Sequence, residues 1–177
     1  MGKILFFGYG ANKDPHRLKE ILGKYPEGGQ GAVLGNYSLA VQTLKQIPTS
    51  AQHILKKVWG DSFQAYTIRK GNGFVEGRIW LIEEEDLEKI KKWEFIGDEN
   101  WREVTTAQAT TSEGKSLSVI TEKSKDSYLV EKIVDGLNYE SNINVEGKKY
   151  YSKEDEYRMN LLRNEIKNYH GNGFVFA

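Results

Sequence analysis

The sequence has no cysteine in its 177 residues, and its charges leave no net excess of either sign. Without cysteine there is no disulfide framework, no thiolate nucleophile and no zinc site built from cysteines. Twenty-five basic residues balance twenty-five acidic ones, so no overall field attracts nucleic acid or an anionic membrane. We therefore expect neither nucleic acid nor a membrane as a partner.

Long apolar runs are also missing. The opening residues MGKILFFGYGANKD turn to glycine and polar side chains too soon for a signal peptide, and no run approaches the ~18 residues that suggest a membrane span. We therefore expect a cytoplasmic protein. Hydrophobic residues make up 38% of the chain and charged residues 28%, which is typical of a globular protein. The length suits one domain over residues 1–177 with a core of its own.

Hydrophobic patterning and turn signals predict both strands and helices, as in an α+β protein. Strands are expected over residues 3–9, 31–42, 74–82, 102–111 and 116–122. Helices are expected over residues 15–22, 83–95 and 126–137. A last helix opens at Ser152, which forms a capping-box pattern with Asp155. Its expected buried stripe consists of Met159, Leu162, Ile166 and Tyr169.

Two further segments carry turn or breaking signals. The Gly-Asn-Gly sequence at 71–73 is typical of a tight turn that leads into the strand at 74–82. Residues 43–58 are interrupted around Pro48, which breaks a regular element. Ser50 is expected to cap a short helix through Leu55, and we interpret the whole segment as a lid or a long loop.

One carboxylate falls where a core residue belongs. Leu87, Ile90 and Glu94 stand at i, i+3 and i+7 of the helix expected over 83–95, so they share one face. Burying an ionised carboxylate costs several kcal/mol unless a partner compensates it. A carboxylate shielded from water in this way suits a general base. The alternative is that the helix frays near Gly97 and that Glu94 points into solvent.

Gly8 to Asn12 form a loop of mostly small residues between the first strand and the first helix. Asp14 and Pro15 predict the start of that helix, as its capping residue and first helical residue. Glycine lets the backbone approach a ligand closely, and amide groups near a helix N-terminus form a cradle for an anion. A ligand carboxylate or a developing oxyanion would fit there. The pattern is not a nucleotide-binding fingerprint, and a tight turn without a ligand is the alternative.

These features together resemble the gamma-glutamylcyclotransferase family. Tyr9-Gly10-Ala11-Asn12 resembles the family's Tyr-Gly-Ser-Asn signature, and residues 87–94 resemble the helix that carries its catalytic glutamate. The order of further similar segments also agrees, namely residues 35–39, 75–80, 101–102 and 127–128 with Gly136. The resemblance covers most of the chain. It implies a small mixed β-barrel flanked by helices, with a cavity between the loop and Glu94, and it implies no cofactor and no metal.

The resemblance also implies a reaction. The α-amine of a γ-glutamyl amide attacks its own γ-carbonyl, 5-oxoproline forms, and an amine or amino acid leaves. Glu94 would be the general acid and base of this transferase or lyase chemistry. The backbone amides of Tyr9, Gly10, Ala11 and Asn12 would bind the γ-glutamyl group, while Tyr9 and Tyr128 would wall the pocket. The partner would be this small-molecule substrate, and the protein would be a monomer or a homodimer.

The sequence departs from the family pattern at three positions and in one segment. Ala11 replaces the loop serine, Phe95 stands where glycine often follows the glutamate, and Trp101 replaces a common tyrosine. The segment over residues 43–72 is longer than we expect from the family pattern. These departures leave the substrate open, so two rivals remain: acyl transfer on another amide, and a non-catalytic ligand-binding or interaction protein on the same fold. A nucleic-acid-binding barrel is a third alternative, against which the neutral net charge argues.

Overall fold

The structure is a computed structural model that describes residues 2–97, 100–134 and 153–170. Its strands are β1 (Lys3–Gly8), β2 (Glu27–Thr43), β3 (Gln64–Glu83), β4 (Arg102–Thr111), β5 (Ser116–Ser124) and β6 (Lys132–Ile133). Its α-helices are α1 (Pro15–Leu22), α2 (Thr49–Trp59), α3 (Glu84–Trp93) and α4 (Lys153–His170). Two 3-10 turns, η1 (Ala11–Lys13) and η2 (Leu44–Gln46), complete the described elements. Within these residues, no helix combines the length and the apolar composition needed to cross a membrane.

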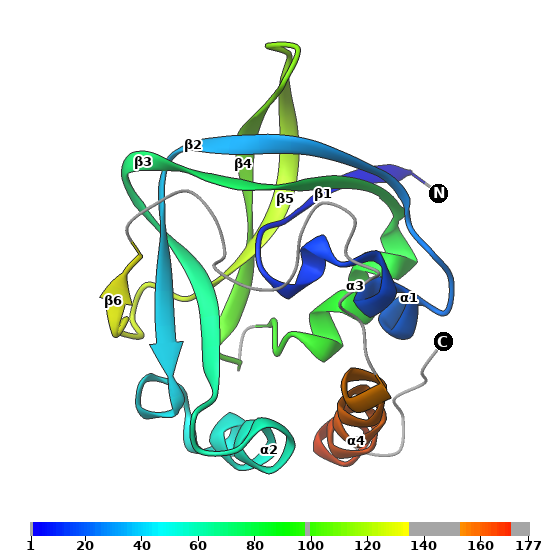
Figure 1. The fold of residues 1–177 in the computed structure, drawn as a ribbon, viewed down its shortest axis with the longest axis vertical. Helices are drawn as coiled ribbons and strands as arrows, with labels where there is room; N and C mark the ends of the chain where they lie inside the picture. The colour runs from blue at the N-terminus through cyan, green and yellow to red at the C-terminus, as the bar shows by residue number, and fades with distance from the viewer. Residues whose placement is uncertain (1, 98–99, 135–152, 171–177) are drawn as a thin grey trace.

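Five strands close into a mixed β-barrel (Figure 1). They run in the order β3-β1-β5-β4-β2, and β2 pairs with β3 again, so the sheet joins onto itself. β1 and β5 pair in parallel at Phe6 and Ile120, whereas the other barrel strands pair antiparallel. Closure pairs the edges that an open sheet would expose. The predicted fold class, an α+β fold with a small mixed barrel flanked by helices, is confirmed.

Two hydrophobic clusters lie on opposite faces of the barrel strands. Phe6 belongs to the cluster that packs against the helices, and the next residue, Phe7, belongs to a cluster that draws on all five barrel strands. Both side chains are fully buried. Consecutive strand residues point to opposite faces. Side chains of this one apolar strand therefore fill the barrel interior on one face and pack against the helices on the other.

Helix α1 begins and ends where the sequence predicted. The Asp14 side chain accepts a hydrogen bond from the backbone N–H of His16 at 2.8 Å, and Pro15 occupies the first helical position. Gly23 follows the last residue with φ of 82°, a left-handed conformation that glycine adopts without steric cost. The cap fixes the exit of the loop that follows β1, and therefore the position of that loop.

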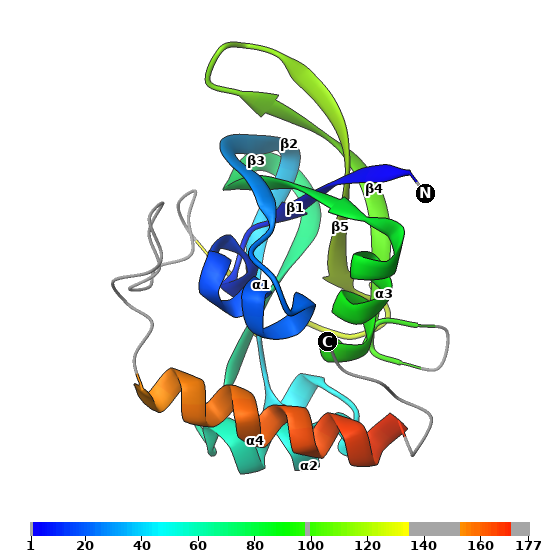
Figure 2. The same cartoon turned by 90° about the vertical axis from the view of Figure 1, so that its right-hand side faces the viewer.

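Helices α2 and α4 lie side by side across one end of the barrel, as Figures 1 and 2 show. An ion pair between Lys57 and Glu165, 2.8 Å apart, joins them. Helix α4 buries Met159, Leu162 and Ile166, as its predicted stripe requires. Ser152 and the side chain of Tyr169 lie outside the described residues. These two helices form the cover of the barrel end.

The predicted lid segment contains a longer helix than expected. Helix α2 runs from Thr49 to Trp59, and Pro48 rather than Ser50 is its N-cap residue. The apolar face of α2, which includes Ile54 and Val58, is buried in the helix-side core. Burial of that face extends the helix beyond Leu55, because tertiary packing supplies most of the stability of a short helix.

The prediction of a tight turn at residues 71–73 is wrong. Strand β3 continues from Gln64 to Glu83 and stays paired with β2 on both sides of these residues. The register shifts at this point, because residues 71–73 of β3 stand opposite the single residue Asn36 of β2, whose φ is 65°. A Cβ added to Gly71 would lie 2.7 Å from Ser38 Oγ. Glycine is thus used for close approach at a bulge, not for chain reversal.

The prediction of a helix over residues 126–137 is also wrong for residues 126–134. Residues 135–137 lie outside the described part of the chain. Residues 132–133 instead form β6, which pairs with β2 at Ala40 and Val41. The backbone N–H groups of Glu131 and Val134 donate to Val41 and Leu39 at 2.7 and 2.8 Å. The β2 edge captures this segment because its backbone groups offer partners that an isolated short helix lacks.

Gly77 in β3 permits the close packing of β3 on β1. A Cβ added there would lie 2.4 Å from Gly8 O and 2.5 Å from the Phe7 ring. We predict that Gly77→Ala lowers the free energy of unfolding by about 1–3 kcal/mol, the usual cost of overpacking, measured by urea denaturation. Gly31→Ala is the control, because an added Cβ there meets nothing within 4 Å. Equal stability of the two variants would contradict this explanation.

Candidate active site

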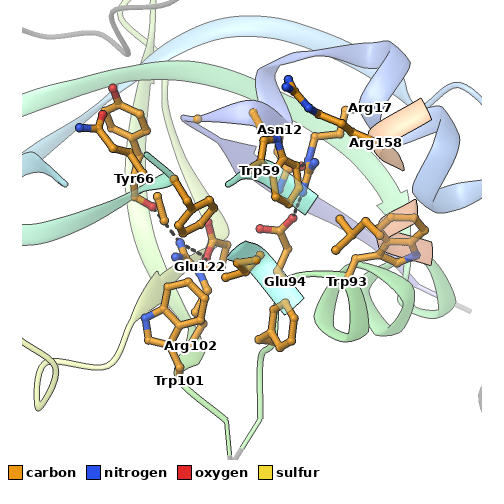
Figure 3. A pocket seen from close by; sticks show the side chains of 18 of the residues that line it. Asn12, Arg17, Trp59, Tyr66, Trp93, Glu94, Trp101, Arg102, Glu122 and Arg158 are labelled. Atoms are coloured by element: carbon orange, nitrogen blue, oxygen red, sulfur yellow. Dashed lines mark hydrogen bonds and ion pairs between the residues drawn. The ribbon is translucent and has the colours of Figure 1, made fainter. Parts of the chain in front are cut away.

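A cavity of about 390 Å³ lies between the loop after β1, the end of α3, and the cover formed by α2 and α4 (Figure 3). Its volume falls in the ~300–1,000 Å³ range of small-molecule sites. The cavity is lined by residues from widely separated parts of the chain, among them Tyr9, Asn12, Arg17, Trp59, Trp93, Glu94, Trp101, Arg102, Glu122 and Arg158. The loop and the glutamate that the sequence singled out therefore share one cavity.

The loop after β1 is held in a single compact turn. A Cβ added to Gly8 would lie 2.4 Å from Asn12 O, so the chain can fold back on itself only with glycine there. The N–H groups of Lys13 and Asp14 donate to Gly10 O and Ala11 O at 3.1 and 3.0 Å. The Trp80 indole N–H donates to Asn12 O at 2.8 Å. All four predicted loop residues, Tyr9 to Asn12, line the cavity.

Glu94 sits at the C-cap of α3, where the chain leaves the helix. Its N–H still donates to Ile90 O at 2.9 Å, which aligns it with the buried face of the helix. Its side chain is 15% exposed and lines the cavity. The chain then turns through Phe95, whose φ of 58° is a conformation that favours glycine. Burial of the Phe95 ring against Trp101, with ring centroids 6.2 Å apart, compensates for that strain.

Arg17 is the charged partner of Glu94. Its Nη2 lies 2.5 Å from Glu94 Oε1 (Figure 3). Its Nε donates to Asn12 Oδ1 at 3.2 Å, and its Nη1 lies 3.5 Å from Met159 Sδ. The Arg17 side chain is 13% exposed. One guanidinium thus joins the loop, the end of α3 and α4, and it offsets the desolvation of the glutamate. Sequence reasoning missed Arg17, because only the packing of α1 near α3 brings this residue to Glu94.

A second charge pair, formed by Arg102 and Glu122, lies on the cavity wall at 2.5 Å and is almost fully buried. Arg102 Nη2 also donates to the Tyr9 hydroxyl at 3.3 Å and to Tyr66 O at 3.0 Å. The Tyr9 hydroxyl donates to the backbone oxygen of Glu122 at 2.7 Å. We call Tyr9, Arg102 and Glu122 the buried network. It fixes the Tyr9 ring as a wall of the cavity.

The electrostatics of the buried network follow from its burial. Desolvation, reinforced by the Glu122 charge, raises the pKa of Tyr9 well above its usual range. Desolvation also raises the pKa of Glu122, against the opposing effect of Arg102. Burial is the largest single effect on Arg102 and disfavours its charged form, but Glu122, Tyr9 and Glu94 together outweigh burial, so the pKa of Arg102 is raised. Tyr9 therefore stays a neutral hydroxyl, already committed as a donor inside the network.

Tyr128 is placed apart from the other predicted site residues. It lies in the turn between β5 and β6, packs against the helix-side core, and is not among the residues that line the cavity. Trp101, at the position of the expected tyrosine, does line the cavity, and its indole N–H donates to Gln42 Oε1 at 3.0 Å. Gly136, from the segment expected to bring Tyr128 to the site, lies outside the described residues.

The charged residues of the cavity wall fit an anionic or zwitterionic small molecule. Arg17, Arg102 and Arg158 face two acids, Glu94 and Glu122, which leaves an excess of one positive charge in this lining. The residues that the structure describes contain no group of three or more His, Cys, Asp or Glu side chains that could hold a metal ion. The chemistry available from these side chains is proton transfer at Glu94 and charge recognition by arginine.

Comparison with known proteins gives likenesses in structure only. No family model matches the chain, and no curated protein matches it in sequence. A solved structure of a gamma-glutamyl cyclotransferase superposes with a TM-score of 0.59 at 16% identity, covering 94% of this chain and 99% of that one. An uncharacterized protein from Homo sapiens gives the same TM-score, identity and coverage. At this identity the likeness concerns the fold.

Proposed function

We propose that this chain, which has the gamma-glutamylcyclotransferase-like fold, is an enzyme that converts a γ-glutamyl amide into 5-oxoproline and a free amine. One observation carries the proposal: the Glu94 carboxylate stands inside a small-molecule cavity whose wall also contains the loop from Tyr9 to Asn12. An acid beside a ring of backbone donors is the pair of groups that this acyl transfer requires.

The Arg17–Glu94 pair supports recognition of a γ-glutamyl head group. That group carries an α-carboxylate and an α-ammonium on the same carbon, and Arg17 and Glu94 offer one charge for each. Binding exchanges the internal ion pair for two charge-assisted hydrogen bonds to the substrate. The α-carboxylate goes to Arg17, and the α-ammonium goes to Glu94, where it must lose a proton before it can attack.

The reaction then follows from the position of Glu94. The carboxylate takes a proton from the α-ammonium, and the freed amine attacks the γ-carbonyl carbon to form the ring C–N bond. The oxyanion that develops accepts hydrogen bonds from backbone N–H groups of the loop. Collapse breaks the amide C–N bond as the protonated Glu94 gives its proton to the leaving nitrogen. Glu94 then takes the second proton from the ring nitrogen and passes it to the amine, which leaves as an ammonium beside 5-oxoproline. Much of the rate comes from positioning, because the nucleophile is already part of the substrate.

The loop works in this scheme without a side-chain hydroxyl. Ala11 offers no oxygen where the family has serine, so the proposed anion contacts come from the backbone and from Asn12. Asn12 is 5% exposed, and its side-chain oxygen already accepts from Arg17. The proposed site therefore relies on arginine charge where the family pattern has a hydroxyl.

The proposal is tested by incubating the protein with γ-glutamyl methylamide and γ-glutamyl phenethylamide and measuring 5-oxoproline by mass spectrometry. We expect product from at least one γ-glutamyl amide and none from the isomeric α-glutamyl amides, whose side-chain carboxylate is not activated for attack. Binding of the γ-glutamyl amides without product would instead identify a non-catalytic ligand-binding protein.

A further inference from the structure

One end of the cavity lies against the cover formed by α2 and α4. The segment that builds this end has no role in the proposed reaction. Leu55 and Trp59 of α2 and Phe63 of the turn before β3 line this end. These residues belong to the 43–72 segment, which the sequence alone identified only as longer than expected, with a lid or a long loop over residues 43–58. In the structure the segment is a fixed wall, held by the buried face of α2 and by the ion pair with α4.

A glycine turn brings two aromatic rings of this wall together. Gly60, with φ of 87°, ends α2 by donating its N–H to Lys56 O at 2.7 Å. The N–H of Phe63 then donates to Gly60 O at 3.3 Å, which closes the turn. The rings of Trp59 and Phe63 come to lie 5.9 Å apart at 46°. Both side chains are only partly buried, so they offer aromatic surface to the cavity.

A second aromatic pair lines the same cavity from the connection between α3 and β4. Phe95 and Trp101 lie with ring centroids 6.2 Å apart, and each is 3% exposed. The indole N–H of Trp101 donates to Gln42, so the polar atom of that ring is satisfied and the remaining ring surface is apolar. We call Trp59, Phe63, Phe95 and Trp101 the aromatic subsite.

We propose that the aromatic subsite binds an aromatic group on the amine side of the substrate. The inference rests on the proposed function, in which Arg17 and Glu94 hold the charged glutamyl head. The amide nitrogen and its substituent then extend into the rest of the cavity, whose wall includes the four rings of the aromatic subsite. An aromatic substituent gains there from apolar burial and from ring stacking. A polar substituent would lose its hydration to groups that cannot replace it.

The test compares two probes that share the glutamyl head, γ-glutamyl phenethylamide and γ-glutamyl methylamide. Binding is measured by calorimetry on the Glu94→Gln variant, which keeps the shape of the side chain while blocking turnover. We expect the phenethylamide to bind about 30-fold more tightly, the gain from burying one aromatic group. Trp59→Ala in the same background should reduce this preference to about fivefold or less. Phe74→Ala is the matched control, because Phe74 is 45% exposed and lies away from the cavity lining.

The outcomes separate the subsite from the reaction. Equal binding of the two probes, or an unchanged preference in Trp59→Ala, overturns the aromatic subsite. So does the binding of neither probe to both the Glu94→Gln variant and the unmodified protein. Formation of 5-oxoproline by the unmodified protein is measured separately on the same probes. A binding preference without any 5-oxoproline would contradict the proposed function and leave the subsite standing. Product formed at equal rates, together with equal binding, would leave the function standing and remove the subsite.

Discussion

Replacing Glu94 by glutamine is expected to reduce kcat for 5-oxoproline formation about a thousandfold, within the range that general acid–base catalysis contributes. Glutamine keeps the size of the side chain and accepts a hydrogen bond from Arg17, so the cavity wall stays in place. It cannot take the proton of the α-ammonium or return one to the leaving amine. Steady-state kinetics gives the change in kcat, and circular dichroism with thermal unfolding shows whether the fold is kept.

A matched substitution on the same helix tests whether the effect belongs to Glu94. Glu88 is 64% exposed and pairs only weakly with Lys91 at the surface, so Glu88→Gln should leave kcat unchanged within about twofold. An active Glu94→Gln protein would remove the proposed acid–base role. The cavity would then be a binding site whose glutamate serves recognition, and an alternative proton acceptor would have to be found among the lining residues.

The parts of the fold that were predictable from the sequence have causes within a few residues. The start of α1 depends on a hydrogen bond between Asp14 and the N–H two residues later, and its end depends on the backbone freedom of Gly23. The errors occurred where a distant partner decides the outcome. Residues 132–133 become a strand because the edge of β2 is available, and residues 71–73 stay in a strand, as a bulge, because β2 pairs with β3 on both sides of them. Neither partner is visible in the local pattern.

The residues of the candidate site divide in the same way, into those that the local sequence predicts and those that distant contacts bring together. Glu94 could be singled out because its helix spacing conflicts with its charge, and that conflict is written in one short segment. Its partner Arg17 lies 77 residues earlier and on another helix, so only the packing of α1 near α3 brings them together. Arg102 and Glu122 lie on strands that were both predicted, but their pairing depends on register. Val104 stands opposite Glu122, which places Arg102 as its diagonal neighbour on the same face.

Arg102→Met is expected to lower the free energy of unfolding by about 3–5 kcal/mol, the cost of leaving one member of a buried ion pair without its partner. The Glu122 side chain is only 8% exposed and would lose its guanidinium partner while remaining largely desolvated. The Tyr9 hydroxyl and Tyr66 O would each lose a donor as well. Urea denaturation followed by tryptophan fluorescence measures the change.

Two further variants decide whether that cost comes from the stranded charge. Lys56→Met removes a cation from a surface pair with Asp61, in which both side chains are mostly exposed, so its effect should stay below about 1 kcal/mol. The double variant Arg102→Met with Glu122→Leu removes both charges, and replacing a buried pair by apolar groups is often close to neutral. We therefore expect the double variant to regain most of the lost stability.

A double variant as unstable as Arg102→Met alone would mean that the loss comes from the hydrogen bonds to Tyr9 and Tyr66 O, because those are the contacts that both variants lack. The buried network would then act mainly by anchoring Tyr9 to the barrel, and stability and the shape of the cavity would depend on the same hydroxyl.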